Sequence, residues 1–372
     1  MIDRRCIRYF DWIGFSLTLG LLIFGLFFVF SATYKPDIPV SLFFKKQLFG
    51  ALSGLGLYLF FSFKDLRNFT RACFFGYFGL LCLLVYTIIG GFIGMGAKRW
   101  ISLAFIRFQP SELVKFILPA FLAYYFCEEQ EVKYPLLSVG NVLPHKIFMF
   151  PLVILGISFL LVAKQPDLGT ALIIIFSGLV TLWFVGLDRR FFIVCGILGL
   201  CAAPLLWHVL KPYQQKRILV LLGQGDTRKE RYQVEQSIIA IGSGGLTGKG
   251  FLKGTQNKLE FLPEDHTDMI FAVIAEEIGF LGVLVLLLLF CLLFIRLMYI
   301  TSCLESFFEQ IMAIGFIMPI FISVIINLAM VMGLLPIVGI PLPLVSYGVT
   351  NLWITLASLG WLNNIAIRRF YY

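Results

Sequence analysis

The sequence predicts an all-α polytopic membrane protein with about ten transmembrane helices and a long extracytoplasmic loop between the seventh and eighth. Of its 372 residues, 59% are hydrophobic and 14% are charged, whereas roughly a quarter of the residues of a soluble protein are charged. The apolar residues form ten long runs, and a membrane-spanning helix needs about 20 mostly apolar residues. We therefore treat residues 1–372 as a single integral membrane domain.

The ten runs are spread along the chain with one long interruption. They lie near residues 12–33, 47–63, 72–91, 111–127, 147–163, 168–187, 191–210, 267–297, 307–333 and 347–367. The eighth and ninth are long enough to tilt or to extend past the bilayer. The first run follows a charged N-terminal stretch that has no small-residue cleavage site, so we interpret it as a retained span and not as a removed signal peptide.

The distribution of Lys and Arg predicts the orientation. If the N-terminus is inside, the inner loops and chain ends hold more Lys and Arg than the short outer loops, as the positive-inside rule requires. An even number of spans then places both termini in the cytoplasm and the loop 211–266 outside. The net charge of +9 is explained by this loop charge, so we expect no nucleic-acid partner.

This orientation brings five polar motifs to one face of the membrane. They are GMGAKRW (94–100), RFQPSELVK (107–115), AKQPDLGT (163–170), the loop 211–266 where it runs into Asp268, and GIPLPLVSYGVT (339–350). We expect a functional site at this outer end of the helices.

The motif RFQPSELVK combines a helix start with charges. Pro110 suits the first turn of a helix, and Glu112 and Lys115 are spaced i, i+3, so they share a face and can pair. The pair either closes the entrance of a span structurally or shapes a polar cavity, because intramembrane charges usually face a bundle interior or a cavity. Arg107 can contact an anionic group as a planar fork. Gln109 belongs to the same candidate site.

Two further motifs have competing interpretations. Asp167 in QPDLGT either caps the following helix or contributes to the site. The stretch IGSGGLTGKG (241–250) resembles a phosphate-binding loop, but the pattern requires Gly at Ser243 and Ser or Thr at Gly250. We therefore expect no nucleotide site, and we interpret the glycines as a turn at the membrane surface.

The stretch EDHTDMIFAVIAEE places Asp268 at the start of the eighth span, with two adjacent glutamates further along. On a helix, Glu276 lies about 80° around from Asp268 and about 12 Å deeper, and Glu277 lies about 180° around. The three carboxylates cannot act as one cluster. Asp268 can reach a substrate at the outer interface, whereas Glu276 or Glu277 contacts neighbouring helices or lines a deeper cavity.

Cysteine and histidine give no sign of a metal cage. None of the eight Cys forms a C-x-x-C pair, and the three His are scattered. Structural disulfides and a Cys zinc site are therefore not expected.

These motifs resemble the SEDS family (shape, elongation, division and sporulation), the RodA/FtsW peptidoglycan polymerases. The resemblance covers the whole chain and rests on six motifs in family order: KRWI, RFQPSELVK, QPDLGT, YQVEQSIIAIGSGGLTGKG, LEFLPEDHTDMIFAVIAEEIG and GIPLPLVSYG. The form of LEFLPEDHTD is closer to the RodA elongation branch than to the FtsW division branch. One departure is Val349, where the family has the second Gly of S-Y-G-G-T.

The resemblance implies a glycosyltransferase in the cytoplasmic (inner) membrane that polymerises lipid II, a disaccharide-peptide on undecaprenyl diphosphate. Asp268 matches the family's essential Asp and would take the proton of the acceptor hydroxyl. Arg99, Arg107 and Lys115 are candidates to steady the diphosphate. A divalent cation, Mg²⁺ or Mn²⁺, is compatible with this chemistry, and its ligands are left open. Ser346 and Tyr347 would supply polar groups at the outer end of the last span.

The family also implies partners, and three alternatives stay open. The partners are a class B penicillin-binding protein transpeptidase and other elongation-complex membrane proteins. The alternatives are an FtsW-like division polymerase, a lipid II flippase and a non-catalytic scaffold. A flippase should carry polar residues through the depth of several spans, whereas here the polar motifs concentrate at one face.

Overall fold

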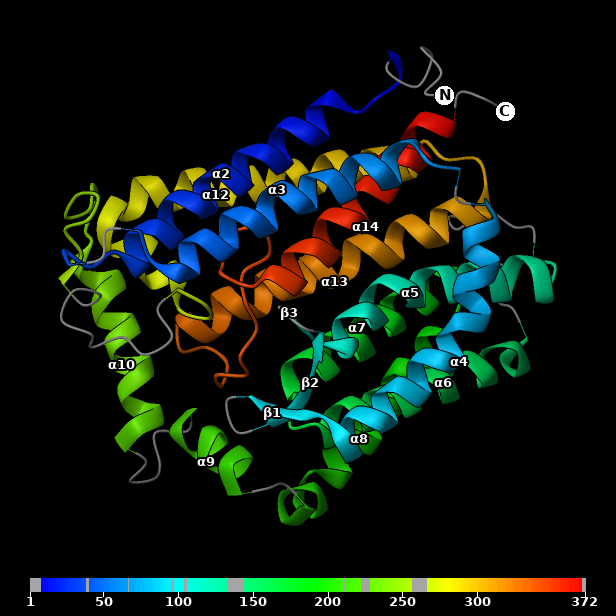
Figure 1. Ribbon diagram of the computed structural model, residues 1–372. Coiled ribbons are helices and arrows are strands. Elements are labelled where there is room, and N and C mark those ends of the chain that lie inside the picture. The colour runs from blue at the N-terminus through cyan, green and yellow to red at the C-terminus, as the bar shows by residue number, and fades with distance from the viewer. Residues whose placement is uncertain are drawn as a thin grey trace.

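A long helix lies over each of the ten predicted runs (Figure 1). The structure, a computed structural model, describes residues 8–37, 40–65, 67–94, 97–103, 106–132, 144–209, 212–221, 228–255 and 266–369. The ten helices are α2 (Trp12–Thr33), α3 (Leu42–Phe63), α4 (Arg67–Gly90), α5 (Pro110–Tyr124, continued by the π-helix η1, Tyr125–Glu129), α6 (His145–Lys164), α7 (Leu168–Val185), α8 (Arg189–Val209), α12 (Ile270–Ser302), α13 (Phe307–Val331) and α14 (Val349–Arg368).

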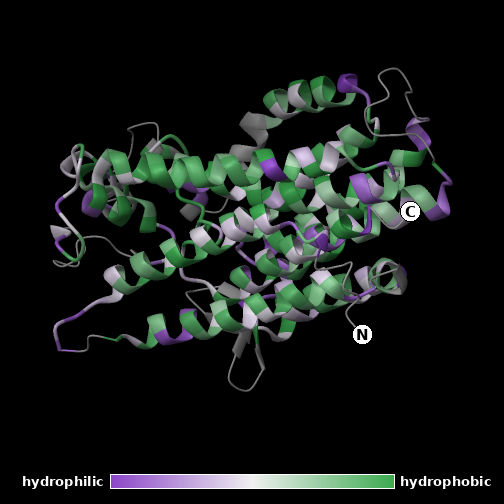
Figure 2. Cartoon of the chain, turned by 90° about the horizontal axis from the view of Figure 1, so that it is seen from above, coloured by the Kyte–Doolittle hydropathy of each residue, from purple (hydrophilic) through white to green (hydrophobic). Residues whose placement is uncertain are grey.

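The surface of the bundle is suited to lipid. Six of the described helices are long and apolar enough to cross a membrane. Large apolar side chains face outward along them: on α12, Leu284, Leu288 and Ile295 are 50%, 56% and 65% exposed. Hydrophobic residues cover the helices, and hydrophilic residues gather mainly towards their ends (Figure 2). The predicted class, a polytopic α-helical membrane protein, is therefore confirmed.

Helices α3 and α14 pack closely because glycines let them approach. A Cβ added at Gly54 would lie 2.6 Å from Leu356 Cδ1, and one at Gly360 would collide with the Tyr58 carbonyl oxygen. Small residues at helix interfaces serve this purpose in membranes, where the lipid provides no hydrophobic drive for association. Ser62 Oγ also donates to the Gly360 carbonyl at 3.2 Å. The last helix is thereby fixed against the second of the ten.

The first and last helices meet at one end of the bundle (Figure 1). The backbone N–H of Asp11, just before α2, donates to Asn363 Oδ1 of α14 at 3.0 Å. The Asp11 carboxylate also pairs with Arg296 of α12 at 2.8 Å. The start of α2 and the end of α14 therefore lie together at one end of the bundle.

Between α4 and α5 the structure contains a small sheet that the all-helical expectation omits. Strands β1 (Phe92–Gly94), β2 (Ala97–Leu103) and β3 (Ile106–Phe108) form an antiparallel sheet in that order. Arg107 pairs with Ser102 across β2 and β3. The stretch is too short for a membrane span. The sheet carries Arg99 and Arg107 to the start of α5.

In the region predicted as the loop 211–266, the described residues include the helices α9 (Pro212–Leu221) and α10 (Arg228–Ser243). Apolar residues recur along α10 at Val234, Ile238 and Ile241, the spacing of one helix face. Ser237 Oγ of α10 donates to the Val331 carbonyl at the end of α13, at 2.8 Å. The long connection between the seventh and eighth predicted spans therefore contains helices, because an amphipathic helix needs no long apolar run to be stable when it docks on its neighbours.

Candidate functional site

Asp268 lies in a turn just before α12, two residues ahead of its first residue, Ile270. Its backbone is held by Asn327 of α13, whose Nδ2 donates to the carbonyls of Asp268 at 2.9 Å and Ile340 at 2.7 Å. The carboxylate is half-buried. A Cβ added at Gly339 would lie 3.3 Å from Asp268 Oδ2, and the φ of Gly339 is +74°. Glycine at 339 therefore lets the connection between α13 and α14 pass close beside the carboxylate.

The Ser346–Tyr347 motif supports the turn that holds Asp268. The Tyr347 N–H donates to the His266 carbonyl at 2.9 Å, and the His266 ring lies 5.5 Å from the Tyr347 ring. Phe43 of α3 packs on both rings, with centroids 4.6 Å and 5.4 Å away. Ser346 instead turns inward, and its Oγ accepts from the Leu342 N–H at 2.8 Å. Tyr347 therefore packs against His266, two residues before Asp268, whereas Ser346 stabilises its own loop.

Gln47 of α3 is a polar contributor that sequence reasoning missed. It is 1% exposed. Its Nε2 donates to the Ser346 carbonyl, and its Oε1 accepts from the Gly348 N–H, both at 3.1 Å. A lone Gln in an apolar run was the available signal, since a buried amide has to find partners.

Asp167 caps the following helix, as one of its two interpretations predicted, and it also joins a second polar cluster. As the residue before α7, it accepts from the Thr170 N–H at 3.4 Å, which is a helix cap. Its other oxygen accepts from Gln109 Nε2 and from Ser111 Oγ. Arg99 lies 3.6 Å from Asp167 Oδ1. Burial raises the pKa of the Asp167 carboxyl, the Arg99 guanidinium lowers it, and the nearby Glu112 raises it.

Glu112 and Lys115 form the predicted i, i+3 ion pair. Lys115 Nζ lies 2.7 Å from Glu112 Oε2, and each side chain is 7% exposed. Asn351 of α14 donates to the same oxygen at 3.1 Å. Lys115 and Asn351 also line a small cavity of about 20 Å³ between α5, α13 and α14, which has room for about one water molecule. The pair thus links α5 to α14 through Asn351, and Lys115 also borders the cavity.

The two clusters lie on either side of one short segment, residues 338–340. On one side, Gly339 passes Asp268. On the other, a Cβ added at Gly169, two residues after Asp167, would lie 2.8 Å from the Val338 carbonyl oxygen and 2.7 Å from Ile340 Cγ1. The structure therefore brings the predicted polar motifs to one end of the bundle. Arg107 lies on β3, and its side chain is outside the described part of the chain.

The eighth run is not one continuous helix, which corrects the sequence prediction. Gly279, inside α12, has φ 66° and ψ −166°, so the helix is broken there. The residues after the break, 280–302, are enough to span a bilayer by themselves. Asp268 therefore precedes a short additional helix, residues 270–278, which ends at the break.

The Gly-rich stretch 244–250 forms backbone hydrogen bonds with residues on both sides of this break. The N–H groups of Lys249 and Gly250 donate to the carbonyls of Glu276 and Glu277, at 3.0 Å and 2.9 Å. Beyond the break, the Phe280 N–H donates to the Gly245 carbonyl at 2.9 Å. A Cβ at Gly248 would collide with the Glu277 carbonyl oxygen. Close backbone approach therefore requires glycine at positions 244 and 248.

The two glutamates, whose role the sequence left open, anchor this arrangement. Glu276 Oε1 accepts from Lys249 Nζ at 2.6 Å and from the N–H and Oγ1 of Thr255, both at 2.8 Å. Glu277 Oε1 accepts from Ser31 Oγ of α2 at 2.5 Å. Both glutamates are almost fully buried. They face different neighbours, so they do not form one cluster with Asp268.

Among the described residues, no group of three or more His, Cys, Asp or Glu side chains lies close enough together to hold a metal ion. We therefore assign no protein ligand set to a divalent cation.

The comparisons with known proteins decide the family. The family model for cell cycle proteins of the FtsW/RodA/SpoVE group matches residues 12–370. The chain belongs to the FtsW/RodA/SpoVE family. Within this family it is 42% identical over 297 residues to peptidoglycan glycosyltransferase MrdB of Escherichia coli K12, a match that covers 79% of this chain and 78% of MrdB.

Solved structures of the same family have the same fold. A chain of a peptidoglycan synthase complex, described as coordinating polymerization and crosslinking, aligns with a TM-score of 0.79 and 28% identity over 98% of this chain and 99% of its own. The rod shape determining protein RodA of Thermus thermophilus aligns with a TM-score of 0.70 and 28% identity, covering 97% and 98%. The FtsW/RodA/SpoVE resemblance that the motifs indicated is therefore confirmed, and the RodA branch is favoured over FtsW.

Proposed function

We propose that this protein is a peptidoglycan glycosyltransferase that polymerises glycan strands from lipid II for cell elongation. The family membership and the relatives named MrdB and RodA support the enzyme class. The observation that carries the proposal is Asp268, a half-buried residue whose backbone carbonyl accepts from Asn327 and whose carboxylate lies beside Gly339, where the polar motifs meet.

In the proposed reaction, the growing glycan on undecaprenyl diphosphate is the donor, and the 4-hydroxyl of the GlcNAc of an incoming lipid II is the acceptor. The bond between the donor's anomeric carbon and its phosphate oxygen breaks, and a bond to the acceptor oxygen forms. Asp268 takes the hydroxyl proton as general base. Diphosphate is a good leaving group, so the reaction does not need the second, protonating carboxyl that glycosidases use.

The ten long helices are proposed to be ten membrane spans, with both termini in the cytoplasm and residues 211–266 on the outer side of the cytoplasmic (inner) membrane. The excess of Lys and Arg in the proposed inner loops supports this orientation. The contact between Asp11 and Asn363, which puts the two ends of the chain together, supports an even number of spans. The site would then face the compartment in which the wall is built.

The proposed partner is a class B penicillin-binding protein transpeptidase, together with other elongation-complex membrane proteins. The support is the structural neighbour whose description joins polymerization to crosslinking. A divalent ion such as Mg²⁺ or Mn²⁺, if used, would take most of its ligands from the substrate diphosphate and water, as Mg²⁺ commonly does at phosphates.

The test is an assay of purified full-length protein with lipid II, in which the product is glycan chains resolved by gel electrophoresis. Glycan formation by the wild type, lost in Asp268→Asn, is the expected result. Transfer of labelled lipid II across liposome membranes with no glycan product would support a flippase instead. An FtsW-like division role would appear as failure to complement loss of the elongation polymerase together with rescue of a division mutant.

A further inference from the structure

Asn327 of α13 is a fully buried amide that joins two segments far apart in the chain. Its Nδ2 donates to the Asp268 carbonyl at 2.9 Å and to the Ile340 carbonyl at 2.7 Å. The first acceptor belongs to the turn before α12, and the second belongs to the connection between α13 and α14. One side chain therefore fixes the Asp268 turn and this connection to the same point of α13.

The stability of the fold does not by itself explain an amide at position 327. Asn327 Oδ1 is buried and accepts no hydrogen bond from the described residues. Burying an acceptor without a partner offsets much of what the two donated bonds contribute to folding. A buried polar atom left in this state calls for an explanation, and functional sites are where such exceptions are expected. The amide is therefore better explained by where it holds the two carbonyls than by the stability that it adds.

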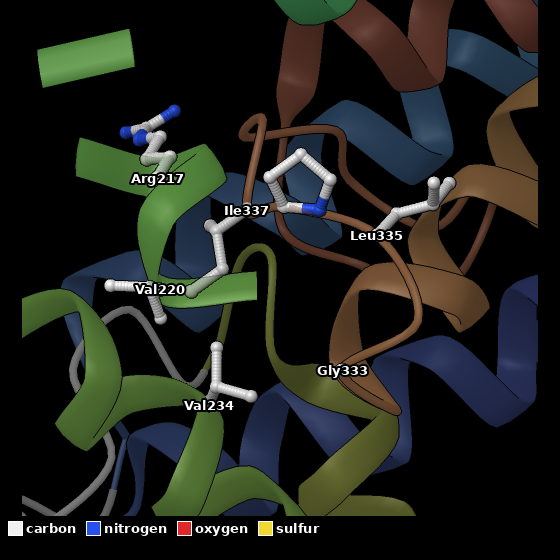
Figure 3. Close-up of a pocket in the computed structure, with 7 residues that line it drawn as sticks. Arg217, Val220, Val234, Gly333, Leu335 and Ile337 are labelled. Carbon is white, nitrogen blue, oxygen red and sulfur yellow. The ribbon is translucent and has the colours of Figure 1, made fainter. Parts of the chain in front are cut away.

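The connection between α13 and α14 is not held by close packing along its whole length. Its first part, from Gly333 to Ile337, borders a cavity of about 70 Å³ (Figure 3). Val220 of α9 and Val234 of α10 line the same space. Side chains beside a void have fewer partner atoms than side chains in a close-packed interior. The bond from Asn327 is therefore an important restraint on the part of the connection nearest Asp268.

The bond to Ile340 also links Asn327 to the second polar cluster. Ile340 packs with Ile173 of α7, and a Cβ added at Gly169 of α7 would lie 2.7 Å from Ile340 Cγ1. Asp167, which caps this end of α7, lies 3.6 Å from Arg99. Asn327 therefore sets the distance between the Asp268 turn and the end of α7 that carries the second cluster.

We propose that Asn327 is a positioning residue of the polymerisation reaction. By holding the carbonyls of Asp268 and Ile340, it fixes the Asp268 carboxylate relative to the Asp167 cluster. A general base must lie within hydrogen-bond reach of the proton that it removes, and a misplacement of about 1 Å can lower a rate by about a hundredfold. Asn327 acts through Asp268 and does not touch the substrate. The inference rests on the proposed function, in which Asp268 is the general base.

The test compares Asn327→Leu with the wild type, as purified full-length protein supplied with lipid II. Leucine is similar in size to asparagine and removes both donors. The molecules able to bind lipid II are titrated first, and kcat is expressed per binding-competent molecule. This kcat should fall by about tenfold to a hundredfold, with the KM for lipid II within about twofold of the wild type. Misfolding would reduce the number of competent molecules and not the kcat of each, so an unchanged kcat would overturn the proposal.

Asn364 of α14 is the matched control. It is also buried, and its Nδ2 donates to the carbonyls of Ser62 and Lys64, both at 2.8 Å. It lies about 22 Å along α14 from the first residue of that helix, Val349. Asn364→Leu should lower the melting temperature and leave kcat per competent molecule at the wild-type value. An equal fall in kcat for both variants would overturn the proposal, because the effect would then be a general loss of buried hydrogen bonds.

A second variant decides the question if Asn327→Leu does not fold. Ser323, one turn earlier on α13, donates to the Pro319 carbonyl of its own helix at 2.6 Å. Asn327→Ser should be satisfied in the same way, so it should fold without reaching Asp268 or Ile340. It should show the same fall in kcat per competent molecule. Wild-type kcat in this variant would overturn the proposal.

Hydrogen exchange separates this inference from the proposed function, because it does not depend on activity. In Asn327→Ser, exchange should rise in residues 266–272 and 338–342 together, since one side chain restrains both segments. Wild-type exchange in both segments would overturn the inference even if the protein polymerises lipid II. Wild-type protein that makes no glycan would remove the polymerase, whereas a joint rise in exchange would still identify Asn327 as the link between the two segments.

Discussion

Gly50 of α3 lies directly against Val349, the first residue of α14. A Cβ added at Gly50 would meet the two methyl groups of Val349 at 3.2 Å and 3.3 Å. Val349 begins a helix and is not among the described residues with positive φ. The residue that departs from the family motif is therefore accommodated by ordinary backbone angles and by a glycine on the facing helix.

This contact predicts different results for its two partners. Val349→Gly should leave polymerase activity within about twofold and lower the free energy of unfolding by roughly 0.5–1 kcal/mol, as Gly does within a helix. Gly50→Ala should destabilise the protein in the Val349 background and less so in Val349→Gly, because the added methyl then has space. Thermal unfolding of the four proteins in detergent checks this. Additive effects would show that the two residues do not touch.

Asp268→Asn should abolish glycan polymerisation while expression and thermal stability stay near wild type. The carboxylate is half-buried at the site, and its backbone carbonyl, which the substitution leaves intact, makes the contact with Asn327. The measurement is glycan formation from lipid II beside a melting curve of the same preparation. Near-normal polymerisation by the folded variant would refute the assignment of Asp268 as general base.

Glu112 and Lys115 should behave as a coupled pair. Removing one partner leaves the other charged and buried, which costs about 3–5 kcal/mol for a buried pair. Glu112→Ala and Lys115→Ala should therefore each be strongly destabilising, and the double variant should be far less so than their sum. Asn351→Ala, which removes only the second donor to Glu112, is a milder comparison. If the double variant loses as much stability as the two single variants added together, the two residues do not interact as a pair.

The orientation can be tested at two exposed positions on opposite sides of the predicted membrane. In a Cys-free background, Lys216→Cys on α9 should label with a membrane-impermeant thiol reagent in intact cells. Glu305→Cys, in the connection between α12 and α13, should label only after permeabilisation. Both residues are exposed, so accessibility within the protein does not limit the reaction. The reverse pattern would invert the topology and place the site in the cytoplasm.

The sequence was a good guide to helices and a poor guide to what connects them. Long apolar runs predict spans because the bilayer core has a fixed thickness and holds no water. A chain that crosses it must satisfy its backbone N–H and C=O groups with its own hydrogen bonds, as a helix does. No such constraint acts on α9, α10 or the sheet that carries Arg99. Their positions depend on contacts such as Ser237 with Val331, which join residues far apart in the chain and cannot be predicted from the local sequence.

The sequence predicted the contacts of the site that are local in the chain, but not those between helices far apart in the chain. The Glu112–Lys115 pair follows from local helix geometry and was predictable. The pairing of Asp167 with Arg99 and the insertion of Gln47 under Ser346 depend on which helices are neighbours. The break at Gly279 was hidden because an isolated Gly is tolerated in a helical run, and only the docked stretch 244–250 makes another conformation favourable there.

The contact between Lys249 and Glu276 provides the last prediction. Glu276 is buried, and Lys249 supplies a charged donor to it. Lys249→Met should lower the free energy of unfolding by about 1–3 kcal/mol, the cost of leaving a buried acceptor poorly satisfied. It should also raise hydrogen exchange in residues 244–255. Because the short helix 270–278 joins this anchored end to the Asp268 turn, polymerase activity should fall as well. Lys253→Met, at an exposed position in the same stretch, is the control, and equal effects of the two substitutions would show that the pair does not anchor the helix.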